Sequence, residues 1–96
     1  MTTALLLIDL QNDYFPGGRY PLWNAEATLD NVETEVAAAR ARGEFVVHVQ
    51  HLASTGAPFF EPGTEGVAIH PRAFAAAPDA PVIVKRHADA FHETGL

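Results

Sequence analysis

The run from Ala4 to Ile8 contains no polar residue, and the charged Asp9 follows it directly. A half-exposed strand alternates apolar and polar residues, whereas an unbroken apolar run predicts a strand that is covered on both faces. Such strands are typical of parallel α/β sheets, which bind ligands beyond the carboxyl ends of their strands. The run therefore predicts an α/β fold with Asp9 at the functional edge of the sheet. Taken alone, Asp9 fits equally well a residue that caps a turn through nearby backbone amides.

Residues 25–42 are predicted to form an amphipathic helix. Apolar side chains recur in this segment with alternating spacings of four and three, at Ala25, Leu29, Val32, Val36 and Ala39. Asn24 is a candidate N-cap, and Gly43 suits the left-handed residue beyond the helix. The apolar run Phe45 to His51 follows, and a crossover of this kind makes the two strands parallel.

A third strand is predicted from Pro81 to Lys85, after a long segment that is rich in Pro and Gly. Loops of that length are commonly lids or binding loops, and Pro71 to Ala77 is predicted to add one or two helical turns within it. In a parallel sheet, Asp9 and Lys85 would lie at the same rim and could meet in one crevice. The alternative is a rim salt bridge, worth about 0 to 1 kcal/mol when it is exposed.

The composition limits the classes of function. A chain of 96 residues suffices for one small domain, and 48% hydrophobic residues indicate a folded protein. A net charge of -6 argues against a nucleic-acid partner, which requires clustered basic residues. The N-terminal apolar segment is too short for a membrane span or a signal core, so we expect no membrane partner and a cytoplasmic protein. Cysteine is absent, which excludes a cysteine nucleophile within these residues.

Four segments, LLLIDLQNDYF, ARARGEFVVHVQH, FFEPGTEG and VIVKRHADAFHETGL, resemble in this order the N-terminal half of isochorismatase-like cysteine hydrolases. The resemblance runs through the whole chain. It implies that residues 1–96 are the N-terminal part of a single hydrolase domain, without the C-terminal part that carries a Cys-bearing helix. The implied fold is a Rossmann-like three-layer α/β/α sandwich around a parallel sheet, incomplete in this chain.

The resemblance also implies a chemistry. The family uses an Asp-Lys-Cys triad to hydrolyse the amide or vinyl ether bond of a small molecule, and by position Asp9 and Lys85 would be its Asp and Lys. A thiolate is the nucleophile, so a carboxylate that takes its proton and a nearby cation make it reactive. Without the Cys, the chain alone is expected to be inactive. The alternative is a truncated, inactive relative that serves as an assembly or ligand-binding module.

Four further residues are predicted to bind substrate: Gln11, Phe15, Phe60 and Phe91. Gln11 is also expected to hold the Asp9 loop by hydrogen bonds. The three phenylalanines lie in predicted loops, which suits the apolar wall of a small-molecule pocket. The alternative for these rings is local packing of a lid onto the sheet.

No metal ligand and no cofactor are predicted. His48 and His51 are three apart on a strand, which places them on opposite faces of the sheet. Zinc-type nicotinamidases of the family carry an Asp-x-His motif near this point, where the present sequence reads HLA, from His51 to Ala53.

A short parallel sheet leaves an uncovered edge, which predicts a homo-oligomer or a complementing chain.

Overall fold

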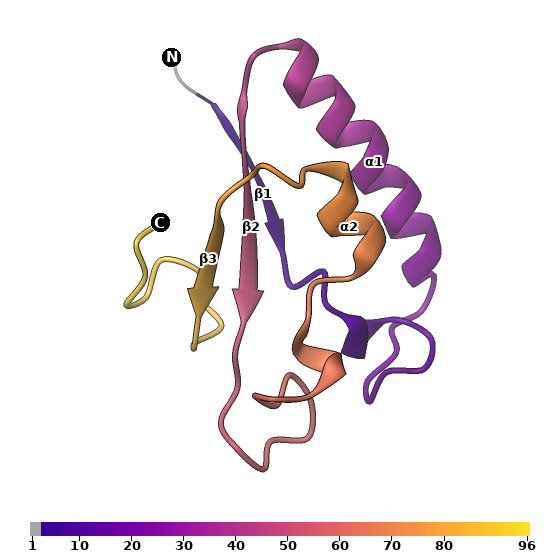
Figure 1. Ribbon diagram of the computed structural model, residues 1–96, viewed down its shortest axis with the longest axis vertical. Coiled ribbons are helices and arrows are strands. Elements are labelled where there is room, and N and C mark those ends of the chain that lie inside the picture. The colour runs from indigo at the N-terminus through magenta and orange to yellow at the C-terminus, as the bar shows by residue number, and fades with distance from the viewer. Residues whose placement is uncertain (1–2) are drawn as a thin grey trace.

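The computed structural model describes residues 3–96 and confirms the predicted α/β fold. Its parallel sheet has the strand order β1-β2-β3 (Figure 1). The strands are β1 (Ala4–Ile8), β2 (Phe45–His51) and β3 (Val82–Lys85). The helical elements are η1 (Asn12–Tyr14), α1 (Ala25–Ala41), η2 (Glu65–Val67) and α2 (Pro71–Ala76).

The strand register brings the carboxyl ends of the strands together. Ile8 of β1 lies opposite Val49 of β2, and His51 at the end of β2 lies opposite Lys85 at the end of β3. All three arrows point to the same edge of the sheet (Figure 1). Asp9 and Lys85 therefore lie at a common rim, as the sequence predicts.

Both helices pack on one face of the sheet. Leu7 of β1 and Val46 of β2 form a buried cluster with Val32 and Val36 of α1. Ala77, which directly follows α2, belongs to the same cluster. The described residues thus build two of the three predicted layers, one sheet and one helical layer.

The opposite face of the sheet is only partly covered. The side chains of Phe45 and Ile8 are 63% and 42% exposed, although their strands have the composition of strands buried on both faces. The segment after β3 shields a part of this face, where Lys85 and Ala90 are buried. The expectation of cover on both faces is therefore wrong for the described chain, because no described helix packs over Phe45 and Ile8.

The helix ends follow the predicted chemistry at Gly43 and Pro71 but not at Asn24. Gly43 has a φ of +71°, the left-handed conformation that ends α1. Pro71 opens α2, and His70 caps it by accepting a hydrogen bond from the Arg72 amide at 3.1 Å. The prediction of Asn24 as N-cap is wrong: its φ is 59°, outside the extended region that capping requires, and its side chain makes no capping bond. Within residues 3–96, no helix is both long and apolar enough to cross a membrane.

Candidate active site

Asp9 and Lys85 form an ion pair at the rim of the sheet. Lys85 Nζ lies 3.4 Å from Asp9 Oδ1, and the exposed side-chain fractions are 3% for Lys85 and 23% for Asp9. Lys85 Nζ also donates a hydrogen bond of 2.9 Å to the carbonyl oxygen of Ala88. The ammonium group is thus held on two sides, and the carboxylate is the part of the pair that remains accessible.

The backbone of Asp9 turns out of the sheet in a left-handed conformation. Its φ is 61°, which short Asp and Asn side chains tolerate better than most others. The Asp9 amide still donates to the Val49 carbonyl at 3.0 Å, so the ladder ends at this residue. Asp9 Oδ1 is buried and accepts no hydrogen bond within the described chain.

Gln11 fastens the Asp9 loop to the ends of two other segments. Its Nε2 donates to the carbonyl oxygens of His51 and Val67, each at 2.8 Å, and its Oε1 accepts from the His51 amide at 2.7 Å. The predicted loop-holding role fits these bonds. The exposed fraction of Gln11 is 0%, so the arrangement gives no support to the predicted contact with substrate.

His51 lies beside the ion pair. Burial lowers the pKa of its imidazole, the positive charge of Lys85 lowers it further, and the negative charge of Asp9 offsets a part of the change. The imidazole is therefore held towards its neutral form. His48 occupies the other face, as predicted, where its Nε2 lies 2.8 Å from the Ala77 carbonyl oxygen.

A cavity of about 310 Å³ adjoins Asp9. Tyr14, Phe15, Leu22 and Trp23 lie among its lining residues, and its size falls in the range of small-molecule sites. Burial raises the pKa of the Tyr14 phenol, with smaller contributions from Asp9 and Tyr20, so the phenol keeps its proton. Phe15, a predicted substrate-binding residue, is thus placed beside Asp9.

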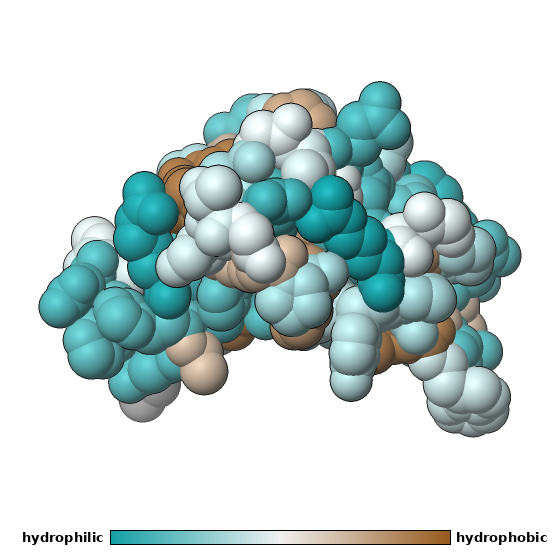
Figure 2. All heavy atoms as spheres, turned by 90° about the horizontal axis from the view of Figure 1, so that it is seen from below, coloured by the Kyte–Doolittle hydropathy of each residue, from teal (hydrophilic) through white to brown (hydrophobic). Residues whose placement is uncertain are grey.

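The cavity has apolar residues in its wall, although the edge of the molecule around it is largely hydrophilic. Figure 2 looks onto the edge where the strands end, and apolar surface shows there mainly between hydrophilic side chains. A separate and larger cavity of about 480 Å³ lies among Asn12, Arg19 and Thr64 but has neither Asp9 nor Lys85 in its wall. The smaller cavity is therefore the better candidate for a reaction at the ion pair.

The other two predicted aromatic residues lie elsewhere. Phe60 is 1% exposed and packs against Tyr14, with ring centroids 4.6 Å apart. This contact fits the alternative of local packing within the loop. Phe91 is 66% exposed, and its part in substrate binding stays a prediction. Phe60 does not line the cavity, but it packs against Tyr14, which does.

Asp13 is a buried carboxylate that sequence reasoning missed. Its Oδ1 accepts from the Arg19 amide at 3.0 Å, and its Oδ2 accepts from the Phe60 amide at 2.7 Å. Gly66 lies against the carboxylate so closely that an added Cβ would overlap it. Asp13 thereby joins the connection between β1 and α1 to the connection between β2 and α2. Phe60 and Gly66 are distant along the chain from Asp13, so no local pattern marks these contacts.

Comparisons with known proteins agree with this architecture. The family model described as Isochorismatase domain matches residues 3–96. The uncharacterized isochorismatase family protein YddQ of Bacillus subtilis is 44% identical over 97 residues, which is 100% of this chain and 53% of YddQ. The secreted isochorismatase effector Isc1 of Verticillium dahliae is 32% identical over 98% of this chain and 48% of its own length.

Solved structures share the same fold. The crystal structure of an isochorismatase hydrolase from Oleispira antarctica superposes with a TM-score of 0.87 and 44% identity. The match covers 97% of this chain and 51% of that one. The chain therefore spans about half the length of the relatives it matches.

Proposed function

Because the chain belongs to the isochorismatase family, we propose that Asp9 and Lys85 are two members of a hydrolytic Asp-Lys-Cys triad. The single observation that carries the proposal is their ion pair of 3.4 Å at the rim of the sheet, beside a cavity. The 96 residues contain no cysteine, so the nucleophile would come from outside them.

Each residue has a defined part in the proposed reaction. Asp9, whose carboxylate is the accessible part of the ion pair, takes the proton of the thiol. Lys85 supplies a positive charge that stabilises the thiolate and lowers the pKa of the thiol. With an amide substrate, the thiolate attacks the carbonyl carbon, and Asp9 gives the proton to the departing amine as the C–N bond breaks. In the second step Asp9 takes a proton from the water that attacks the acyl-enzyme, and the thiolate leaves as the acid product is released.

The proposed substrate is a small molecule with an amide or vinyl ether bond. The cavity beside Asp9 holds about 310 Å³, and the rings of Tyr14 and Trp23 among its lining suit a planar or partly apolar group. Isc1 is named as an isochorismatase, which favours the vinyl ether, whereas the name of YddQ gives only the family. No metal or cofactor is part of the proposed reaction.

A second candidate function is a ligand-binding or assembly module without catalysis. An apolar groove of about 360 Å³ along β1, lined in part by Leu6 and Val32, favours it. Such a module would bind a small molecule or a partner chain in this groove but would not turn substrate over. The predicted cytoplasmic location stays a prediction under either function.

The deciding experiment starts with the intact mass of the natural gene product. A product heavier than 10.3 kDa is then assayed against a panel of small amides and vinyl ethers, before and after alkylation with iodoacetamide. Turnover that alkylation abolishes, and that Asp9→Asn lowers by orders of magnitude, supports the triad. Undiminished turnover in Asp9→Asn contradicts it. A product of 10.3 kDa without turnover supports the binding module.

A further inference from the structure

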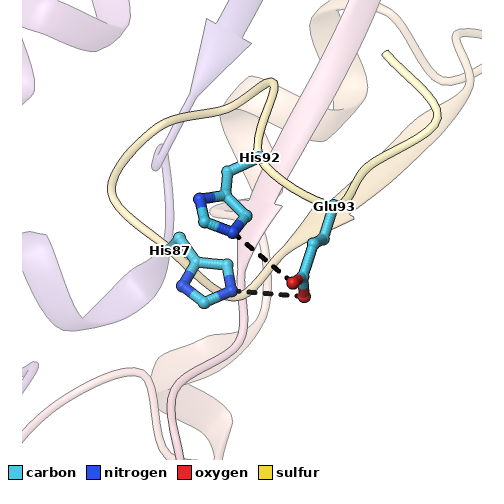
Figure 3. Close-up of side chains that lie close together, drawn as sticks. All are labelled: His87, His92 and Glu93. Carbon is cyan, nitrogen blue, oxygen red and sulfur yellow. Dashed lines mark ion pairs between the residues drawn. The ribbon is translucent and has the colours of Figure 1, made fainter.

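The turn that follows β3 gathers three side chains that suit a transition metal. One ligand atom each from His87, His92 and Glu93 lies within 4.8 Å of the others, and all three residues are exposed. Figure 3 shows both imidazole rings on one side of the Glu93 carboxylate, each with a nitrogen directed towards one of its oxygens. These residues lie outside the proposed triad and outside HLA, the segment that the sequence analysis considered for a metal.

The distances match the edges of a coordination polyhedron. His87 Nε2 lies 3.5 Å from Glu93 Oε2, and His92 Nε2 lies 3.5 Å from Glu93 Oε1. A direct N–H···O hydrogen bond is shorter, at about 2.9 Å. Tetrahedral zinc with bonds of about 2.0 to 2.1 Å separates its ligand atoms by about 3.3 to 3.4 Å. Each imidazole nitrogen therefore lies close to ligand spacing from one carboxylate oxygen of Glu93, and one ligand atom of each residue lies within 4.8 Å of the others.

The local backbone holds the three groups together. The Phe91 amide donates to Asp89 Oδ1 at 2.9 Å, and Thr94 Oγ1 donates to the Ala90 carbonyl at 2.7 Å, which closes the turn between the histidines. Glu93 has a φ of 54°, so its backbone leaves the turn in a left-handed conformation. The imidazole rings are stacked, with centroids 4.0 Å apart and planes at 26°. Exposed rings can splay about their side-chain torsions to direct both lone pairs at one ion.

The other histidines are engaged elsewhere. His48 is buried against the Ala77 carbonyl, the His51 ring packs on Phe60, and His70 caps α2. The pair His87 and His92 is thus the available imidazole pair among the described residues. The chain carries a net charge of -6, which favours a cation at its surface.

We propose that His87, His92 and Glu93 bind one divalent transition-metal ion of the zinc, cobalt or nickel class. Two imidazoles and one carboxylate exclude magnesium and calcium as preferred ions, since these select oxygen ligands. Three protein ligands leave one position for water. Binding would brace the turn that contains Ala88, whose carbonyl oxygen holds Lys85 Nζ at 2.9 Å. The ion would therefore stabilise the position of Lys85 from outside the proposed triad.

The test is titration of the untagged chain with zinc sulfate by isothermal calorimetry, with cobalt chloride as a spectroscopic probe. We expect one ion per chain, cobalt absorption bands in the visible range, and no displacement by excess magnesium. The double variant His87→Ala/His92→Ala should bind at least 100-fold more weakly, and Glu93→Gln about 10-fold more weakly. Circular dichroism checks that these exposed substitutions leave the fold intact.

His70→Asn is the matched control, because Asn can keep the cap of α2 while one other imidazole is removed. It should bind zinc as the unsubstituted chain does. Absence of binding to the unsubstituted chain overturns the proposal, and so does undiminished affinity in the double variant. Neither outcome depends on hydrolytic activity, so a failure here is distinguishable from a failure of the proposed function.

Discussion

Gln11 and His51 exchange two hydrogen bonds, from Gln11 Nε2 to the His51 carbonyl at 2.8 Å and from the His51 amide to Gln11 Oε1 at 2.7 Å. The side-chain amide of Gln11 thus makes the donor and acceptor bonds that the backbone of a neighbouring strand would make, just beyond the end of β1. The connection fixes the loop that follows Asp9 to the last residue of β2, and so the position of Asp9 depends on a residue that has no exposed surface.

Gln11→Ala is expected to lower the free energy of unfolding by about 2 to 3 kcal/mol, because it leaves the half-buried His51 amide and carbonyl without this partner. Urea unfolding followed by circular dichroism measures the change. Gln50→Ala is the matched control. Gln50 donates one hydrogen bond, to the Val67 carbonyl, which Gln11 also serves, so its loss should cost about 1 kcal/mol. Equal losses in both variants would contradict the role given to Gln11.

Asp9→Asn in the complete enzyme is expected to lower kcat/KM by about 100- to 10,000-fold, the usual contribution of a general base. Asn keeps the size of the side chain and tolerates the φ of 61°, so the variant should keep the fold, which circular dichroism checks, although Lys85 loses its charged partner and the melting temperature should fall. For the lysine, Lys85→Met is preferable to Lys85→Ala, because the side chain is 3% exposed and truncation would open a cavity. Near-normal turnover in either Asp9→Asn or Lys85→Met would refute the assignment of that residue.

Asp13→Ala is expected to cost about 2 to 4 kcal/mol of stability, since it leaves the Arg19 and Phe60 amides without their charged acceptor. Asp79→Ala is the matched control, because Asp79 pairs with Arg40 at the surface and such pairs contribute about 0 to 1 kcal/mol. Thermal and urea unfolding of both variants give the comparison. A loss as small as that of Asp79→Ala would show that Asp13 does not hold the loops.

Acidification is expected to destabilise the fold through two histidines. Burial lowers the pKa of His51 and of His70 below the ordinary value of 6.5, with help from Lys85 and Arg72 respectively. A group with a depressed pKa contributes its stability above the unfolded value and loses it as the pH falls through the folded value. The free energy of unfolding should thus decline below about pH 6.5.

The variant His51→Gln isolates one part of that decline. Its unfolding free energy should fall less steeply between pH 6.5 and pH 5 than that of the unsubstituted chain. A steeper slope in His51→Gln would mean that the sign of the His51 contribution is reversed.

The exposed apolar face of the sheet is expected to pair with another chain. Phe45 and Ile8 are exposed on it, and the edge of β1 has no described neighbour other than β2. Multi-angle light scattering should detect a dimer or larger species, and Phe45→Lys should shift the mass towards that of one chain. A monodisperse monomer for the unsubstituted chain would refute this prediction.

Local pattern was sufficient to predict the strands, the helix α1 and the rim position of Asp9 and Lys85. Each of these follows from periodicity and from the rule that parallel strands end at one edge. Asp13 and His51 could not be found in this way, since their significance depends on residues far along the chain. The cap at Asn24 was misjudged for a related reason: residue type favours a cap, but the incoming loop sets a left-handed backbone there.

The strand order β1-β2-β3 also has a consequence for biosynthesis. Each strand pairs with its nearest neighbour in sequence, and each connection returns over the same helical face. Nothing in the described sheet has to wait for a later strand to be inserted between two earlier ones. We therefore expect this half of the fold to assemble in the order in which it leaves the ribosome, with β1 and β2 paired before β3 is synthesised.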